Sequence, residues 1–339
     1  MHLQPLGANP FATALAFLYG PGVYLRNKWY DHARAYRPPR KTISIGGIHA
    51  GGTGKTPVAL LVGHHLVESG RQVAFLSRGY RRRLKTPVIV RPEETRPWDE
   101  IGDEPCVMRQ ELPEAWLGVG ASRARSASRL SRLLDQSAVF VLDDGFQHRS
   151  IHRDLDIVCL PPDPFRDRLI PSGYLREPLS SLGRADVLCV IGARHETDIL
   201  EGSSQRLERR FPAAMTVALY QEAQCWVCLR TGEEADRPPL KNPAVLTGIA
   251  RPERYIRMVR EQGIIPHSVF SYEDHHVFTG SEIRGPLSGG ADGLCTTHKD
   301  ACRLRSFALV QSIDIWYLKV VLRFCRETAR RSFGDLLSA

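Results

Sequence analysis

A glycine-rich segment between an apolar run and a helix-like stretch constrains the fold of this 339-residue chain most. The string GGIHAGGTGKTP occupies residues 46–57 and follows the apolar run TISI. The spacing G-x-x-x-x-G-K-[ST] of a phosphate-binding loop would place glycine at position 49, where this chain has His49. The remaining GGTGKT is still typical of a loop whose backbone N–H groups turn toward phosphate oxygens at a helix N-terminus. We therefore expect a nucleotide-binding P-loop.

The roles of the P-loop residues follow from this geometry. Lys55 would reach the β- and γ-phosphates of ATP, and the Thr56 hydroxyl would bind Mg²⁺. A P-loop also needs a carboxylate at the end of a neighbouring strand to hold the metal, and Asp143 and Asp144 follow the apolar run AVFVL. Two carboxylates ending a buried strand are costly without a cation, which favours metal binding. The expected phosphate cradle comprises Gly51, Gly52, Thr53, Gly54, Lys55 and Thr56.

Short apolar runs alternate with helix-like stretches from residue 42 onward. This pattern predicts an α/β fold of the P-loop NTPase type, with a mostly parallel sheet covered by helices on both faces. Ligands would then bind at the carboxyl ends of the strands. The segment TPVALLVGHHLVESG has apolar residues at helical spacing and predicts a helix that ends at Gly70. The expected strands cover residues 42–48, 72–77, 115–120, 138–144, 156–160 and 186–192.

The pattern changes after Gly192. Residues 213–231 read as two extended runs, which we expect to form a hairpin linker. A second, smaller α/β unit follows, with a helix over RPERYIRMVREQG. Its expected strands lie near residues 244–249, 264–270 and 293–297.

The N-terminal residues are apolar first and then aromatic and basic. The run FATALAFLYGPGVYL is too short for a transmembrane helix and is broken by Gly20-Pro21-Gly22. It is followed by RNKWYDHARAYRPPRK, a pattern typical of a segment lying in the membrane interface beside anionic lipid. The alternative is a helix packed on its own domain. A net charge of +9 and a pI near 9.3 also favour an anionic partner.

Three further polar clusters are candidates for function. IGDEP lies in an expected loop, where a helix cap is the alternative role for its carboxylates. SRGYRRR follows a strand and could bind phosphate, but no nucleic-acid recognition module accompanies it, so we expect no nucleic-acid partner. YEDHH taken alone is as typical of a surface as of a catalytic site. The candidates are Asp103 and Glu104, Arg78 and Arg81 to Arg83, and Asp274, His275 and His276.

The order of the motifs resembles one known family. GGTGKTP, SRGY, GDEP, DDGFQH, LREP, DHH and THKDACRL follow one another between residues 42 and about 304, and this series is similar to that of tetraacyldisaccharide 4'-kinases of the lipid A pathway. The resemblance implies a kinase at the cytoplasmic face of the bacterial inner membrane. Such an enzyme transfers the γ-phosphate of ATP to the 4'-hydroxyl of a tetraacyldisaccharide 1-phosphate. The chain departs from the family pattern at Gly47, Ile48 and His49, at Arg81 and at His298.

The resemblance also implies roles for individual residues. Asp103 would accept the proton of the sugar hydroxyl, supported by His275. Asp143 or Asp144, together with Glu177 and Thr56, would hold Mg²⁺. Gln147 and His148 would lie near the phosphate site, for which Arg78 is a further candidate.

The resemblance and the strand pattern together suggest four segments. Two alternative functions stay open: a P-loop ATPase switch at the membrane surface, and a soluble small-molecule kinase. The segments are an N-terminal membrane-associated segment (1–41), a P-loop kinase core (42–205), a linker (206–237) and a C-terminal α/β domain (238–339).

Overall fold

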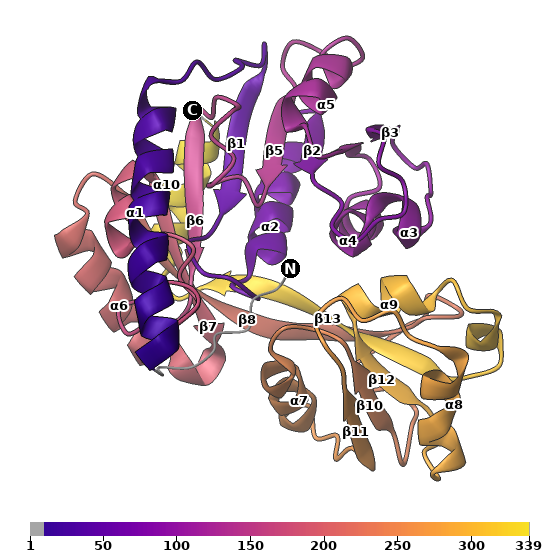
Figure 1. Ribbon diagram of the computed structural model, residues 1–339. Coiled ribbons are helices and arrows are strands. Elements are labelled where there is room, and N and C mark those ends of the chain that lie inside the picture. Colours follow the sequence, from indigo (N-terminus) through magenta and orange to yellow (C-terminus); the bar gives the residue numbers. More distant parts are fainter. Residues whose placement is uncertain (1–9, 339) are drawn as a thin grey trace.

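The computed structural model describes residues 10–338 and contains two lobes built on one curled sheet (Figure 1). The sheet has thirteen strands within this part of the chain. Its order is β11-β10-β12-β13-β8-β7-β6-β1-β5-β2-β4-β3, and β9 pairs with β8.

The N-terminal lobe holds the mostly parallel half of the sheet. Its strands carry apolar residues on both faces, because helices cover both. Only β3 runs antiparallel to its neighbour among the strands from β1 to β7. The strands are β1 (Lys41–Gly46), β2 (Val73–Ser77), β3 (Val88–Val90), β4 (Trp116–Val119), β5 (Val139–Asp143), β6 (Leu155–Leu160) and β7 (Val187–Ala193).

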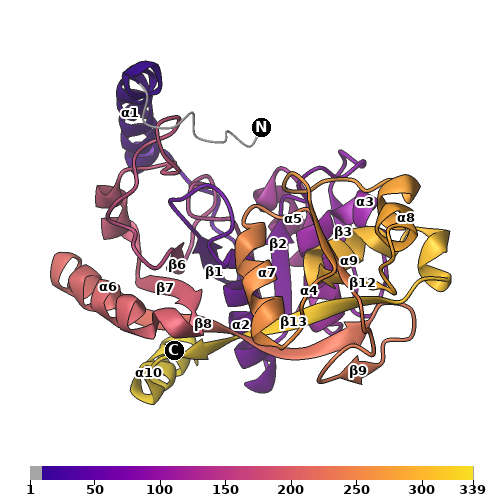
Figure 2. The same ribbon diagram turned by 90° about the horizontal axis from the view of Figure 1, so that it is seen from below.

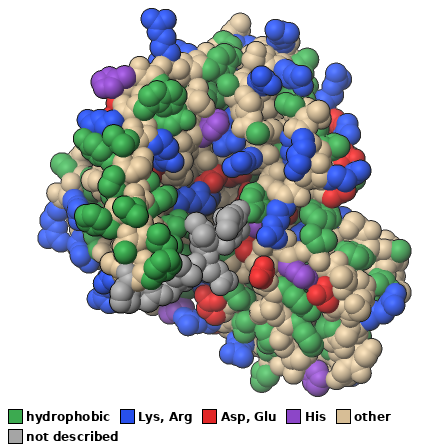
Figure 3. Space-filling view, in the orientation of Figure 1, with side chains coloured by type: hydrophobic (Ala, Val, Ile, Leu, Met, Phe, Trp, Pro, Cys, Tyr) green, Lys and Arg blue, Asp and Glu red, His purple; other side chains and the backbone are tan. Residues whose placement is uncertain are grey.

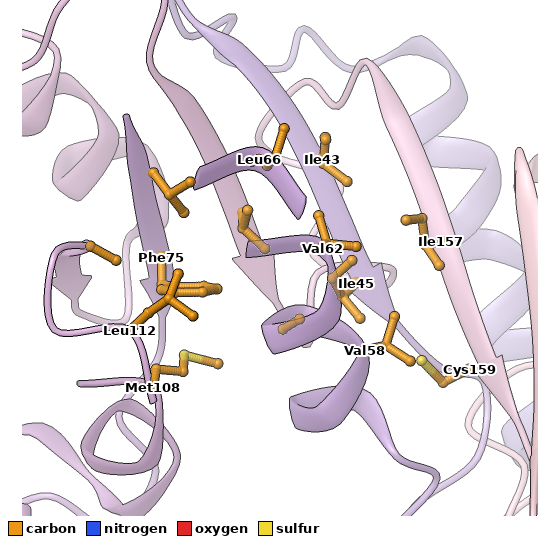
Figure 4. Close-up of a cluster of buried hydrophobic side chains, with 14 of the residues drawn as sticks. Ile43, Ile45, Val58, Val62, Leu66, Phe75, Met108, Leu112, Ile157 and Cys159 are labelled. Carbon is orange, nitrogen blue, oxygen red and sulfur yellow. The ribbon is translucent and has the colours of Figure 1, made fainter. Parts of the chain in front are cut away.

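Helices divide between the two faces of this lobe. Val139 and Val141 of β5 pack with the helices of one face, whereas Phe140 and Leu142 pack on the other. Figure 4 shows the first face, where Val58 and Val62 lie against the strands. On this face lie α2 (Lys55–Glu68), α4 (Asp103–Glu111) and α10 (Glu327–Ser338), and on the other lie α5 (Arg123–Leu130) and α6 (Thr197–Arg210); α3 (Trp98–Ile101) precedes α4.

The C-terminal lobe repeats the arrangement on a smaller scale. Its parallel strands have α7 on one face and α8 and α9 on the other. The expected strand at 264–270 begins later, at Ser268, because a turn at 262–263 and an irregular segment up to residue 267 follow α7. The elements are β9 (Glu234–Ala235), β10 (Ala244–Thr247), α7 (Pro252–Glu261), β11 (Ser268–Ser271), α8 (Gly280–Ser288), β12 (Leu294–Thr297) and α9 (His298–Leu304).

Two long antiparallel strands join the lobes. β8 (Met215–Cys228) pairs with β7 at its start and with β13 (Ile315–Phe324) over most of its length. The two extended runs expected at 213–231 are therefore one strand, and its hairpin partner β9 has only two residues. After β13 the chain returns to the N-terminal lobe, where Phe333 and Leu337 of α10 are buried in the core that contains α2. Residues 327–338 thus pack apart from the rest of the expected C-terminal domain.

Helix α1 (Pro10–His32) lies at the edge of the N-terminal lobe, away from the C-terminal lobe (Figures 1 and 2). The expectation of a break at Gly20-Pro21-Gly22 was wrong, because the helix continues through Pro21. Within residues 11–32 of this helix, the buried hydrophobic residues are Ala12, Ala16 and Val23. No helix within residues 10–338 has the length and apolar character needed to cross a membrane.

Candidate active site

A cleft of about 790 Å³ lies between the two lobes. Its walls come from loops at the carboxyl ends of parallel strands in both lobes, as expected for an open α/β sheet. The N-terminal lobe contributes the P-loop after β1, Ser77 and Arg78 at the end of β2, and Asp143 and Asp144 at the end of β5. The C-terminal lobe contributes residues 249–251, 274–275 and 297–299. Acidic and basic side chains are both visible in the hollow at the centre of Figure 3.

The P-loop has the backbone that a phosphate cradle requires. Gly51 (φ 87°) and Gly54 (φ 81°) adopt left-handed conformations, which side chains other than glycine rarely tolerate. Gly52 does not adopt a left-handed conformation, so Gly51 and Gly54 are the glycines that the shape of the loop requires. Gly54 caps α2, and its missing side chain leaves room for Ile191 of β7, since a Cβ would lie 3.0 Å from Ile191 Cδ1. The N-terminus of α2 therefore points its partial positive charge into the cleft.

His49 is a packed side chain of the loop. It is fully buried, and its Nε2 lies 3.7 Å from Asp167 Oδ2. Burial lowers the pKa of His49 to about 4, which outweighs the opposite effect of Asp167. The imidazole is therefore neutral at pH 7 and does not line the cleft. His49 replaces a glycine of the P-loop pattern without placing a charge beside the phosphate site.

The two aspartates after β5 lie in different surroundings. Asp143 is buried and accepts a hydrogen bond from Ser77 Oγ at 2.9 Å. Burial, together with the charges of Glu104 and Asp144, raises the pKa of Asp143 to about 7. Asp144 has a left-handed backbone (φ 47°), and its carboxylate lies 2.9 Å from Arg176 Nη1 and 3.6 Å from Lys55 Nζ.

The charges around Asp144 offset its desolvation. Burial alone would raise the pKa of Asp144, but Lys55 and Arg176 hold it below the usual value. Within residues 10–338, Asp144 forms ion pairs with Lys55 and Arg176, whereas the more deeply buried Asp143 forms none and Lys55 only partly offsets its desolvation.

A second pair of ionisable groups forms across the lobes. His275 Nδ1 lies 2.7 Å from Asp103 Oδ2, although the two residues are 172 positions apart. His275 has a left-handed backbone (φ 61°), a strained conformation of a kind that is common at functional sites. Asp103 begins α4 and is only 3% exposed, so the expected loop position was wrong. His275 lines the cleft and Asp103 lies behind it.

Two cations of α9 hold this pair. Arg303 Nη1 lies 3.3 Å from Asp103 Oδ2, and Lys299 Nζ lies 3.2 Å from His275 Nε2. Burial would raise the pKa of Asp103, but Lys299, the His275 hydrogen bond and Arg303 lower it below the usual value. Asp103 is therefore ionised, and a lysine that donates to Nε2 requires that His275 donate from Nδ1 to Asp103. Lys299 and Arg303 were not predicted as site residues, although both lie within the motif THKDACRL.

Glu177, predicted to bind Mg²⁺, lies outside the cleft and contacts nitrogen donors of the protein. Its carboxylate is fully buried and accepts from Arg184 Nη2 (2.8 Å), Arg26 Nη2 (3.1 Å) and Asn27 Nδ2 (2.8 Å). These donors come from α1 and from residues 179–184, and Glu177 does not line the cleft. Both oxygens are occupied by nitrogen donors, so Glu177 anchors α1 to the lobe.

The remaining predicted residues lie at different distances from the cleft. Arg78 lines it. Gln147 does not, but its Nε2 donates to the backbone oxygen of Gly47 (3.0 Å) and so supports the start of the P-loop. His148 lies 3.2 Å from Ser150 Oγ, and burial lowers its pKa to about 4. Arg78 remains a candidate for contact with phosphate, whereas the contacts of Gln147 and His148 are with other protein groups.

The donors in the cleft suit Mg²⁺. Within residues 10–338 no group of three or more His, Cys, Asp or Glu side chains could hold a metal ion on its own. Mg²⁺ commonly takes one or two carboxylates and completes its shell with water and substrate phosphates. The buried Asp143 carboxylate and the Thr56 hydroxyl line the same cleft and match that chemistry.

Comparisons with known proteins place these features in a family. A family model described as tetraacyldisaccharide-1-P 4'-kinase matches residues 8–337. The tetraacyldisaccharide 4'-kinase of Bdellovibrio bacteriovorus is 33% identical over 307 residues, covering 87% of this chain and 89% of that protein. The enzyme of Chlorobium phaeovibrioides is 30% identical and covers 99% of both chains. The crystal structure of LpxK from Aquifex aeolicus in complex with ATP has a TM-score of 0.75 at 28% identity, covering 96% of this chain and 98% of that one.

The position of Glu177 leads to a first prediction. Glu177→Gln should loosen α1, because it removes the carboxylate charge that Arg26 and Arg184 share. We expect faster amide hydrogen exchange in residues 10–32, measured by mass spectrometry, with unchanged affinity for Mg²⁺ in the presence of ATP. A weaker Mg²⁺ affinity with unchanged exchange would instead restore Glu177 as a metal ligand.

The pKa of Asp143 leads to a second prediction. Between pH 3.8 and about 7 the folded protein keeps a proton on Asp143 that the unfolded chain has lost. The stability of the nucleotide- and metal-free protein should therefore fall as pH rises through this window. Asp143→Asn should reduce the fall in Tm between about pH 5 and about pH 8. The control is Asp99→Asn, whose side chain is 39% exposed and which should retain the wild-type profile. Identical profiles for Asp143→Asn and wild type would contradict the assignment.

Proposed function

Because the chain belongs to the tetraacyldisaccharide-1-P 4'-kinase family, we propose that its cleft transfers the γ-phosphate of ATP to the 4'-hydroxyl of a tetraacyldisaccharide 1-phosphate. One observation carries this proposal: Asp103 of the N-terminal lobe and His275 of the C-terminal lobe form a pair beside the cleft that also contains the P-loop. A P-loop alone would also suit an ATPase switch. Transfer of phosphate to an alcohol also needs a group that accepts the hydroxyl proton, and a histidine oriented by a buried carboxylate can do this.

The nucleotide end of the cleft is built for phosphate. Backbone N–H groups of residues 51–54 and the N-terminus of α2 would bind the β- and γ-phosphates, with Lys55 held in place by Asp144. Arg176 neutralises the other side of Asp144, which leaves Lys55 free to contact phosphate. Asp143 and Thr56 would hold Mg²⁺. The metal, when bound, would neutralise charge on the phosphate oxygens.

The acceptor end would handle the hydroxyl proton. The resemblance assigned the proton to Asp103, but Asp103 lies behind His275 and His275 lines the cleft. We therefore assign the first contact with the hydroxyl to His275 Nε2, which accepts the proton. Asp103 fixes the Nδ1–H tautomer and stabilises the imidazolium that forms. Lys299 donates to Nε2 when the acceptor is absent and already contacts Glu104 Oε1 at 3.2 Å, so it would keep the Glu104 contact when the hydroxyl takes its place at Nε2.

Helix α1 supports a site at the membrane surface. Its outer face carries large exposed hydrophobic side chains, visible as the green area at the left of Figure 3. Phe17 is 81% exposed and Leu18 is 72% exposed. Exposed apolar surface of this extent beside basic residues suits insertion into the interface of anionic lipids, at the cytoplasmic face of the inner membrane. The other exposed members of this face are Phe11, Leu15, Tyr24, Leu25 and Trp29.

The transfer of phosphate is the direct test. Purified protein with γ-³²P-ATP and a tetraacyldisaccharide 1-phosphate in detergent micelles should label the lipid. Asp103→Asn should lower kcat by about 100-fold or more with little change in KM for ATP, since it removes the charge that supports His275. Asparagine is preferred to alanine because it keeps a polar partner for the buried Arg303. Lys55→Ala should impair both ATP binding and turnover.

Controls separate the alternatives in this assay. Asp99→Asn on the neighbouring α3 should behave as wild type. Phosphate released only to water, with no labelled lipid, would favour the ATPase switch. Equal loss of ATP binding in Asp103→Asn would remove the assigned role of the Asp103–His275 pair.

The role of α1 has its own test. Replacing Phe17 and Leu18 together by serine should weaken binding to vesicles containing phosphatidylglycerol by at least about tenfold, because each buried side chain contributes about 1.5 kcal/mol or more. Flotation of the protein with the vesicles measures this. The matched control is Ile265→Ser in the C-terminal lobe, where the side chain is 87% exposed. Unchanged flotation of the double variant would contradict membrane contact through α1.

A further inference from the structure

Two arginines stand on the C-terminal lobe where it faces the P-loop. Arg251 is the residue before α7, and Arg254 lies in its first turn. The preceding residue, Ala250, lies against the P-loop, since a Cβ on Gly51 would be 3.8 Å from the Ala250 Cβ. Both arginines line the main cleft. They also line an adjoining cavity of about 370 Å³, whose other walls are Ala50, Gly51, Tyr174, Ala250 and Glu253. The first turn of α7 therefore faces the phosphate cradle from the opposite lobe.

Although the charges of Glu196 and Glu253 act on Arg254, the two guanidinium groups have no anion in direct contact within the part of the chain that the structure describes. Neither forms a hydrogen bond or an ion pair there, and Arg251 lies over the ring of Tyr174 at 5.9 Å. Arg257, one turn further along α7, instead contacts His195 Nε2 at 2.9 Å. Half-burial and the neighbouring charge of Arg251 lower the pKa of Arg254 below its usual value. Arg254 is thus held where an anion would relieve both its desolvation and its repulsion by Arg251.

Two other cations near the P-loop share one carboxylate. Lys55 and Arg176 both contact Asp144, so part of their charge is offset before any phosphate binds. A triphosphate needs additional positive charge on the side that faces away from α2. The first turn of α7 offers two guanidinium groups and the positive end of a helix at that position.

We propose that Arg254, with Arg251 beside it, contacts the phosphate chain of ATP from the C-terminal lobe. This inference rests on the proposed kinase function and adds a second wall to its nucleotide site. A planar guanidinium binds two phosphate oxygens at once, so Arg254 can fix the orientation of the chain as well as its charge. Nucleotide binding then joins α7 to the P-loop and holds the two lobes together around the acceptor.

Nucleotide affinity tests this inference without the acceptor. Titration calorimetry of the full-length protein with ATP should give a Kd raised by about 10- to 100-fold in Arg254→Gln, the loss expected for charge-assisted hydrogen bonds. Arg254→Lys should show a smaller loss, because the charge remains but the bidentate geometry does not. The matched control is Arg260→Gln, which alters an exposed arginine in the last turn of the same helix and should bind ATP as wild type.

Three results would overturn the inference. One is an ATP affinity of Arg254→Gln within about twofold of wild type, a difference smaller than one hydrogen bond would give. Another is an unchanged ATP affinity with a raised KM for the lipid acceptor, which would assign Arg254 to the acceptor's 1-phosphate. The third is an equal loss in Arg260→Gln, which would indicate a nonspecific effect of charge.

Folding and function are checked separately. Far-UV circular dichroism and Tm establish that each variant is folded, and if Arg254→Gln does not fold, Arg254→Lys and Arg251→Gln must show the loss of ATP affinity. The transfer reaction of the wild type decides the proposed function independently. Labelled lipid from wild type together with unchanged ATP binding in Arg254→Gln would refute this inference alone.

Discussion

The antiparallel pairing of β8 with β13 is the constraint on which the rest of the structure depends. It extends one sheet from the N-terminal lobe into the C-terminal lobe, so the carboxyl ends of two sets of parallel strands border the same cleft. For this reason the P-loop and His275 line the same cleft, although they belong to different lobes. A pair of long strands also fixes the lobes more firmly than a flexible linker would, because alternate residue pairs of β8 and β13 exchange backbone hydrogen bonds along the connection.

Much of the fold was predictable because its strands are short, apolar and separated by turn residues. Strands β1, β2 and β4 to β7 and helix α2 lie within a few residues of the expected ranges. The sequence predicted two strands in place of β8, because half-exposed, mostly polar residues at 220–224 interrupt the apolar pattern where the strand passes between the lobes. The position of α10 depends on tertiary packing, since Phe333 and Leu337 are buried only when the chain returns to α2. Local patterns carry no information about such a return.

The candidate site was predictable where a motif lies next to its own strand. Lys55 lies where the loop after β1 meets α2, and Asp143 is the last residue of β5. Both line the cleft. The partners of these groups come from distant segments, and spacing could not identify them. Glu177 shows the limit most clearly: a carboxylate beside a site arginine is equally compatible with a metal and with neighbouring cations, and only the three-dimensional arrangement distinguishes them.

Helix α1 contacts two consecutive residues, Arg176 and Glu177, and this links it to the phosphate cradle. Tyr19 donates to the backbone oxygen of Arg176, and Arg26 contacts Glu177. Arg176 in turn holds Asp144, which contacts Lys55. If α1 lies in the membrane interface as proposed, this chain of contacts would set the height of the phosphate cradle above the lipid headgroups. The cleft would then accept only a hydroxyl that lies at the matching depth in the bilayer.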